Sequence, residues 1–267
     1  MDAFLGLSAL PLWLSAIIVL GLTTAIAVLA PLYVRRRVGF EKLVVNNEVA
    51  GFKYATLGVI YAVLLAFAVI TVWEDYRDAE QHADDEAGAW TTLYRLSANL
   101  PEPAARGAVQ EALRGYATAV VAEEWPAMVR GKESAVASAA VSDLYGSFMA
   151  VGGTTPKEMA LLAEALDQLA LLTGSRRERL DKARGALPPI LGLVLIVGAV
   201  LTVGFTLFFG ARNVVAQAAM TGILCFMIML VLFAVLMLNH PFTGEIRVSP
   251  ESIELAVREL AAGPGER

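Results

Sequence analysis

Four stretches of the chain carry no Asp, Glu, Lys or Arg and are long enough to cross a lipid bilayer. They cover residues 10–34, 54–73, 186–211 and 214–239. A helix needs about 20 apolar residues to span the hydrocarbon core. The hydrophobic content of 57% and the mean hydropathy of +0.61 also exceed those of soluble domains. The sequence therefore predicts an all-α membrane protein with four transmembrane helices and argues against a soluble enzyme.

The uncharged stretches divide the chain into four parts. These are a first helix pair (1–73), a region rich in Ala, Leu, Glu and Arg (74–185), a second helix pair (186–239) and a tail (240–267). Residues 74–185 show few strand patterns, so we expect a helical extramembrane domain inserted between the second and third spans. No proline lies between Tyr54 and Asn99. We therefore expect the second span to continue into this domain as one helix.

The first stretch is expected to remain in the protein as a span. No Lys or Arg precedes it. It is also longer than the roughly 7–15 apolar residues in the core of a signal peptide.

Local motifs predict where further helices begin and end. The sequence Thr155-Pro156-Lys157-Glu158 combines an N-cap threonine, a first-turn proline and a capping-box glutamate. Pro101-Glu102-Pro103 is expected to end the helix that precedes it, because proline lacks the N–H that a helix interior needs. In the tail, Ser249-Pro250-Glu251 predicts the start of a short amphipathic helix. Its expected apolar face consists of Ile253, Ala256, Val257 and Leu260.

The sequence contains few residues and no motif typical of a catalytic or metal site. The single cysteine, Cys225, excludes an intrachain disulfide and a cysteine-based metal cage, and a histidine site would have only His82 and His240. No Gly-rich phosphate loop or Ser/His/Asp arrangement is present. We expect no enzyme activity, no metal, no cofactor and no nucleic-acid partner.

Positive charges in the short loops predict the orientation in a bacterial inner membrane. The loop between the first two spans carries Arg35, Arg36, Arg37, Lys42 and Lys53. The turn between the last two spans carries Arg212. The positive-inside rule places both loops in the cytoplasm, so the helical domain and both termini are expected in the periplasm. The basic stretch 176–184 before the third span argues the other way.

Polar residues precede the second span. Asn46 or Asn47 can cap the helix that follows, and Glu48 in its first turn complements the positive end of the helix dipole. A sharper alternative is that Glu48 contacts an ion at the entrance of a pore-lining helix, since a carboxylate close to hydrocarbon is costly.

Small residues recur every three or four positions in two of the spans. They are Gly51, Ala55, Gly58 and Ala62 in the second, and Gly198, Thr202, Thr206 and Gly210 in the third. Such spacing lets helix backbones approach closely. We expect these residues to pack helices, within or between subunits, and a pore lining is the alternative.

An acidic stretch follows the second span. Residues 74–86 hold seven carboxylates and one arginine, and the basic stretch 176–184 abuts the third span. We expect the two stretches to pair, as exposed ion pairs worth about 0 to 1 kcal/mol each. Alternatively, acidic faces from several subunits ring an opening and concentrate cations.

Several further motifs occupy residues 47–52, 58–67, 72–74, 239–244 and 248–251. They resemble those of the bacterial bestrophin-like family, long catalogued as a domain of unknown function. The resemblance implies kinship with bestrophins, which are oligomeric, mostly pentameric, anion channels. Their subunits have four membrane helices and a large helical domain on the cytosolic side. Four motif residues have no assigned role: Asn47, Asn239, His240 and Pro241.

We therefore expect an ion-conducting homo-oligomer in the lipid bilayer, with the second span nearest its axis. The residues expected to meet inorganic ions are Glu48, Tyr61, Glu74 and Asp78. The ion selected is left open. The alternative is a membrane-anchored sensor or scaffold whose helical domain binds a protein partner.

Overall fold

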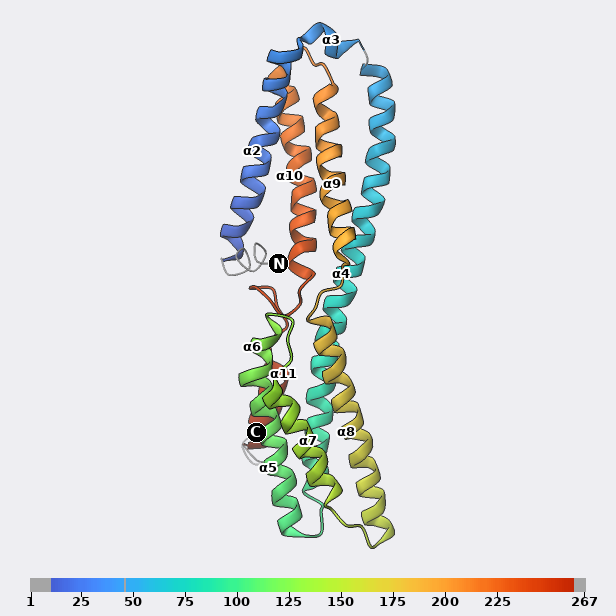
Figure 1. Ribbon diagram of the computed structural model, residues 1–267, viewed down its shortest axis with the longest axis vertical. Helices are drawn as coiled ribbons and strands as arrows, with labels where there is room; N and C mark the ends of the chain where they lie inside the picture. The colour runs from blue at the N-terminus through green and yellow to red at the C-terminus, as the bar shows by residue number, and fades with distance from the viewer. Residues whose placement is uncertain (1–10, 46, 262–267) are drawn as a thin grey trace. The chain divides into compact units, whose positions relative to one another are not determined.

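The computed structural model describes residues 11–45 and 47–261, and within these ranges the chain is helical without a β-strand (Figure 1). The prediction of an all-α chain with four long apolar helices is confirmed. The chain folds as two compact units. The first unit contains residues up to Glu74, 186–239 and 244–246, and the second contains 75–185, 240–243 and residues from 247 onward.

Four apolar helices and one short helix build the first unit. They are α2 (Leu12–Val38), α3 (Phe40–Val44), the first half of α4 (Asn47–Ser97), α9 (Pro189–Phe205) and α10 (Val214–Leu238). One 3₁₀ turn, Thr206–Phe208, extends α9. The helix α10 packs against α2 and α9 (Figure 1). By length and composition, α2, α4, α10 and α9 with its 3₁₀ turn are able to cross a membrane.

Local chemistry sets the ends of these helices. Helix α2 stops at Gly39, whose φ of +83° suits glycine and whose N–H donates to the carbonyl of Arg35. Asn213 caps the start of α10, because its Oδ1 accepts from the N–H groups of Val215 and Ala216. Helix α4 runs unbroken from Asn47 to Ser97 and contributes to both units.

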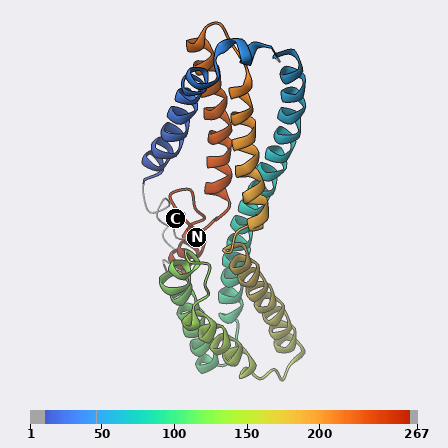
Figure 2. The same ribbon diagram turned by 45° about the horizontal axis from the view of Figure 1, so that its top comes forward.

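Five further helices join the second half of α4 in the second unit. They are α5 (Pro103–Ala119), α6 (Trp125–Met128), α7 (Ala135–Met149), α8 (Pro156–Lys182) and α11 (Glu251–Ala261). A π-helical turn, Val120–Glu124, separates α5 from α6. In both views α8 runs beside the second half of α4 (Figure 2). Large side chains fill the core between these helices, among them Trp90, Leu113, Phe148, Leu172 and Ile253.

The predicted helix starts of this unit are confirmed. Thr155 caps α8 by accepting from the Glu158 N–H at 3.2 Å, and the Glu158 carboxylate accepts from the Thr155 N–H at 3.1 Å. Helix α4 ends at Ser97, just before Pro101-Glu102-Pro103, as predicted, and Pro103 occupies the first turn of α5. On α11, Ile253 and Ala256 are buried as expected, whereas the side chain of Leu260 lies outside the described residues.

Candidate functional site

The four predicted ion-contact residues lie at different depths along α4. Glu48, Glu74 and Asp78 are exposed, whereas Tyr61 is 4% exposed. Glu48 and Glu74 are 26 positions apart. At 1.5 Å per residue they are roughly 39 Å apart along the helix, enough to flank a hydrocarbon core of about 30 Å. Ion contact stays a prediction for all four.

Tyr61 joins α4 to α9. Its hydroxyl donates to the carbonyl of Leu195 at 3.0 Å. Its ring lies so close to Gly198 that a Cβ at position 198 would stand 2.5 Å from Tyr61 Cε2. Only a glycine leaves room for this ring.

Asn47 ties the start of α4 to the turn after α9. Its Nδ2 donates to the carbonyl of Gly210 at 2.8 Å, and its Oδ1 accepts from the Gly210 N–H at 3.0 Å. The expectation that Asn47 caps α4 is therefore wrong, because both polar atoms of its amide serve another segment. The turn after a helix leaves backbone groups without intrahelical partners, and Asn47 satisfies two of them. Asn46, the other expected cap, lies outside the described residues.

The small residues of the predicted packing faces have different surroundings. A Cβ at Gly210 would lie 2.7 Å from the Val44 nitrogen, so this glycine also permits a close contact. Gly51 lies near Phe209, whereas Gly58 faces open space. Thr206 Oγ1 lies 3.4 Å from Thr221 Oγ1, and Thr202 is buried, whereas Ala55 and Ala62 are exposed. A packing role for the exposed positions stays a prediction.

The motif after α10 shapes the connection that follows the helix. Asn239 Oδ1 accepts from the Leu187 N–H at 2.8 Å, just before α9. The Pro241 carbonyl accepts from the Val248 N–H at 2.7 Å and closes a loop. The His240 carbonyl accepts from the N–H of Thr243 at 3.1 Å within that loop.

A buried ion network lies in the core of the second unit. Arg179, Glu86 and Glu124 are each 0% exposed. Arg179 reaches Glu86 through two bonds, Nε to Oε2 at 2.6 Å and Nη2 to Oε1 at 3.0 Å. Its Nη2 also donates to Glu124 Oε2 at 2.9 Å. Buried charges are tolerated only when they are paired and hydrogen-bonded, as these are.

Two further side chains complete the network. Arg176 donates to both oxygens of Glu124, and Tyr116 donates to Glu86 Oε1 at 2.6 Å. Two guanidinium groups thus neutralise two carboxylates. Burial and the Glu86 charge raise the pKa of Tyr116 well above its usual 10.0. Burial lowers the pKa of Arg179, but Glu86, Tyr116 and Glu124 together outweigh burial and raise that pKa overall.

The π-helical turn delivers two neighbouring residues to Arg179. Glu124 ends the turn and binds the guanidinium, and Trp125 follows it with its ring 4.4 Å from the Arg179 Cζ. The Trp125 indole also donates to the Val248 carbonyl at 3.2 Å and packs edge-on against Phe242. Trp125 therefore connects the loop after α10 to the buried network.

The expected pairing of the acidic and basic stretches is confirmed, but its exposed character is only partly right. Lys182 Nζ lies 2.9 Å from an Asp75 oxygen and 3.0 Å from an Asp78 oxygen, near the surface. The Arg179–Glu86 pair of the same two stretches is fully buried. The role of Glu124 could not be predicted, because nothing in its local sequence marks it as buried.

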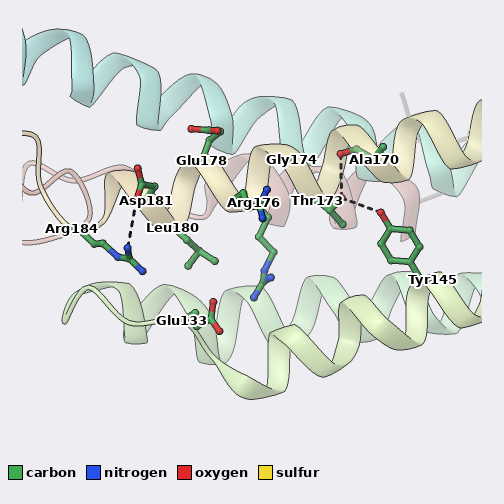
Figure 3. Close-up of a pocket in the computed structure, with 11 residues that line it drawn as sticks. Glu133, Tyr145, Ala170, Thr173, Gly174, Arg176, Glu178, Leu180, Asp181 and Arg184 are labelled. Carbon is green, nitrogen blue, oxygen red and sulfur yellow. Dashed lines mark hydrogen bonds and ion pairs between the residues drawn. The ribbon is translucent and has the colours of Figure 1, made fainter.

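A cleft of about 800 Å³ lies in the second unit beside α8 (Figure 3). Tyr145 and Thr173 share a hydrogen bond of 3.2 Å at one end, and Arg184 pairs with Asp181 at the other. The lining carries three arginines and three carboxylates, so neither sign dominates. Among the described residues, no group of His, Cys, Asp or Glu is arranged to hold a metal ion.

Comparison with known proteins identifies the family. The Bestrophin-like domain matches residues 21–253, most of the chain. The chain belongs to the bestrophin-like family, as its motifs predicted, and is a multi-pass membrane protein. No curated protein matches it.

Solved structures include a similar fold. A single-residue variant of a bacterial bestrophin homolog from Klebsiella pneumoniae has a TM-score of 0.67 and 17% identity. The match covers 94% of this chain and 99% of the other. At this identity the likeness concerns the fold alone.

Proposed function

We propose that this chain is one subunit of a homo-oligomeric ion channel in the bacterial inner membrane. The family match over residues 21–253 carries the proposal. Kinship with bestrophins supports ion conduction. The likeness of fold to a bacterial bestrophin homolog agrees with it.

The burial pattern of the first unit supports assembly. In α2, α4 and α9, only 17% of the most apolar stretch is buried within the chain, against 39% in α10. Lipid or further subunits must cover the rest. Among the described residues of this unit, the buried polar side chains are uncharged: Ser15, Thr202, Gln217 and Thr221. An ion path between copies therefore fits better than a path through one chain.

Helix α4 is the proposed lining of this path. Its exposed Glu48 and Glu74 flank the uncharged stretch, and its exposed Ala55 and Ala62 leave space for ions or for a neighbouring helix. Rings of carboxylates at the two mouths favour cations, whereas kinship with bestrophins favours anions. The reversal potential in a salt gradient distinguishes these alternatives.

We further propose that residues 75–185 form an extramembrane domain, because their core holds a charged network that hydrocarbon would disfavour. Arg35 Nη1 donates to the Ala211 carbonyl at 2.9 Å, so the two short basic loops share one side of the bilayer. The positive-inside rule assigns that side to the cytoplasm and residues 75–185 to the periplasm.

Cysteine labelling tests this orientation. Two variants are made in a Cys225→Ser background, Lys132→Cys and Arg37→Cys. Intact spheroplasts that carry either variant are treated with a membrane-impermeant maleimide. Labelling at position 132 alone supports a periplasmic domain. Labelling at position 37 alone would show that residues 75–185 lie in the cytoplasm instead.

Ion flux from proteoliposomes tests the channel. Purified protein is reconstituted and release of entrapped potassium or chloride is followed, while native mass spectrometry counts subunits. Flux from an oligomer supports the proposal. A monomer without flux of either ion contradicts it.

A second candidate function is a membrane-anchored sensor or scaffold whose second unit binds a protein partner. The cleft beside α8 favours it, because its mixed charges suit a protein surface better than a small ion. Pull-down with purified full-length protein tests this alternative. The scaffold would be favoured if the protein shows no ion flux and if Arg177→Glu, in the cleft, abolishes binding of a partner that the unsubstituted protein retains.

A further inference from the structure

Two loops of the first unit meet at one end of its helices. Arg35 Nη1 donates to the carbonyls of Ala211 and Arg212, at 2.9 and 3.2 Å, and Asn47 binds both backbone groups of Gly210. In both views α3 and the turn between α9 and α10 lie at the same end of this unit (Figures 1 and 2). The segments 35–45, 47–53 and 209–213 thus form one surface, here called the basic loop surface.

Exposed cations dominate the basic loop surface. They are Arg36, Arg37, Lys42, Lys53 and Arg212. The exposed carboxylates are Glu41 and Glu48, which leaves a surplus of three positive charges. In the part of the chain that the structure describes, none of these five cations takes part in an ion pair. Unpaired cations gathered in this way attract anions.

Exposed apolar side chains lie among the same cations. Val45 and Phe52 are each 79% exposed, and Val49 is 59% exposed. The positive φ of Gly39 turns the chain into α3, which bridges the ends of α2 and α4 (Figure 1). Bare apolar groups beside cations are unfavourable in water but suit the boundary between lipid headgroups and acyl chains.

We propose that the basic loop surface binds the phosphodiester headgroups of anionic phospholipids. A guanidinium group, such as that of Arg36 or Arg212, can bind two oxygens of one phosphate at once. The ammonium groups of the lysines on this surface add positive charge. The apolar side chains contact the adjoining acyl chains, which a soluble phosphate does not offer. This proposal requires no ion conduction and stands independently of the channel.

Spin-labelled lipids test the proposal on the full chain reconstituted in phosphatidylcholine. Electron paramagnetic resonance measures the association of labelled phosphatidylglycerol relative to labelled phosphatidylcholine. We expect a preference of about twofold or more for phosphatidylglycerol, reduced at high salt. The triple variant Arg36→Gln/Arg37→Gln/Arg212→Gln is expected to bring the ratio close to one.

A matched triple variant controls for total charge. Arg95→Gln/Lys132→Gln/Lys157→Gln removes the same charge from exposed positions of the second unit. It should keep the preference, and sn-glycerol 3-phosphate should not displace the lipid. Equal association of both lipids with the unsubstituted protein would overturn the proposal. Displacement of the lipid by sn-glycerol 3-phosphate would also overturn it. So would an equal loss of the lipid preference in the two triple variants, when gel filtration shows that both are folded.

Discussion

Arg179 and Glu86 form a two-bond ion pair with no solvent access, although 93 positions separate them in the chain. Removing both charges from water is costly, and a second carboxylate, Glu124, shares the guanidinium. Arg176 completes the charge balance by binding Glu124. Through this network α8 is fixed to α4 and to the π-helical turn.

Arg179→Met is expected to lower the free energy of unfolding by about 3–5 kcal/mol, because it leaves Glu86 charged and buried without its partner. Denaturant unfolding of the full chain in detergent measures the change. Arg184→Met is the control, since its exposed pair with Asp181 is worth less than about 1 kcal/mol. Similar losses in the two variants would contradict the assignment of the network.

Trp125→Phe is expected to loosen the loop after α10 without disturbing the network. Phenylalanine keeps an aromatic ring over Arg179 but loses the indole N–H that donates to Val248. We expect the free energy of unfolding to fall by about 1 kcal/mol, because one hydrogen bond is lost. Hydrogen exchange should accelerate at the Val248 amide, which donates to Pro241. Unchanged exchange there, with Trp73→Phe as the exposed control, would argue against this connection.

Gly198→Ala is expected to destabilise the first unit by about 1–3 kcal/mol, because the new methyl group would overlap the Tyr61 ring. Gly192→Ala in the same helix is the matched control, since a Cβ there meets no neighbouring atom within 4 Å. The control should be neutral or stabilising by up to about 1 kcal/mol. Thermal unfolding in detergent compares them. Equal melting temperatures would show that Tyr61 does not pack on Gly198.

The start of α8 is expected to depend on pH through Glu158. Hydrogen bonds from the backbone N–H groups of Thr154 and Thr155 lower the pKa of Glu158 below its usual 4.5. A lowered folded-state pKa contributes stability above pH 4.5, and this contribution is lost as the pH falls through the lowered value. Deuterium uptake at these two amides, corrected for intrinsic rates, should rise on acidification.

Glu158→Gln provides the control for this titration. Glutamine still completes a capping box but carries no titrating group, so uptake at the two amides should no longer change with pH. A pH dependence that survives in the variant would assign the effect to another residue.

Features set by neighbouring residues could be predicted from the sequence. The capping box at Thr155 and Glu158 needs residues only three positions apart, and the end of α4 at Ser97 follows from the two prolines at 101 and 103. The four apolar helices follow in the same way from uncharged stretches long enough to span a bilayer. The bestrophin-like motifs were sufficient to predict the family.

The pairing of residues 74–86 with 176–184 could be predicted, because the two stretches carry opposite charges, but other features set by distant residues could not. The local sequence indicates a helix cap at Asn46 or Asn47, yet the Asn47 amide binds Gly210, 163 positions away. Glu124 meets Arg179 across 55 positions, at the end of a π-helical turn that no local pattern indicated. In the proposed homo-oligomer, the ion contacts of α4 would also depend on neighbouring copies, which one sequence does not specify.

Current across a planar bilayer that contains the purified protein, under a salt gradient, tests the central proposal most directly. We expect unitary currents whose reversal potential gives the sign of the ion. Glu48→Gln and Glu74→Gln should each change the conductance or the selectivity, because both carboxylates flank the proposed path. Silence from folded, inserted protein over a wide range of voltage and pH would contradict the channel and favour the sensor or scaffold.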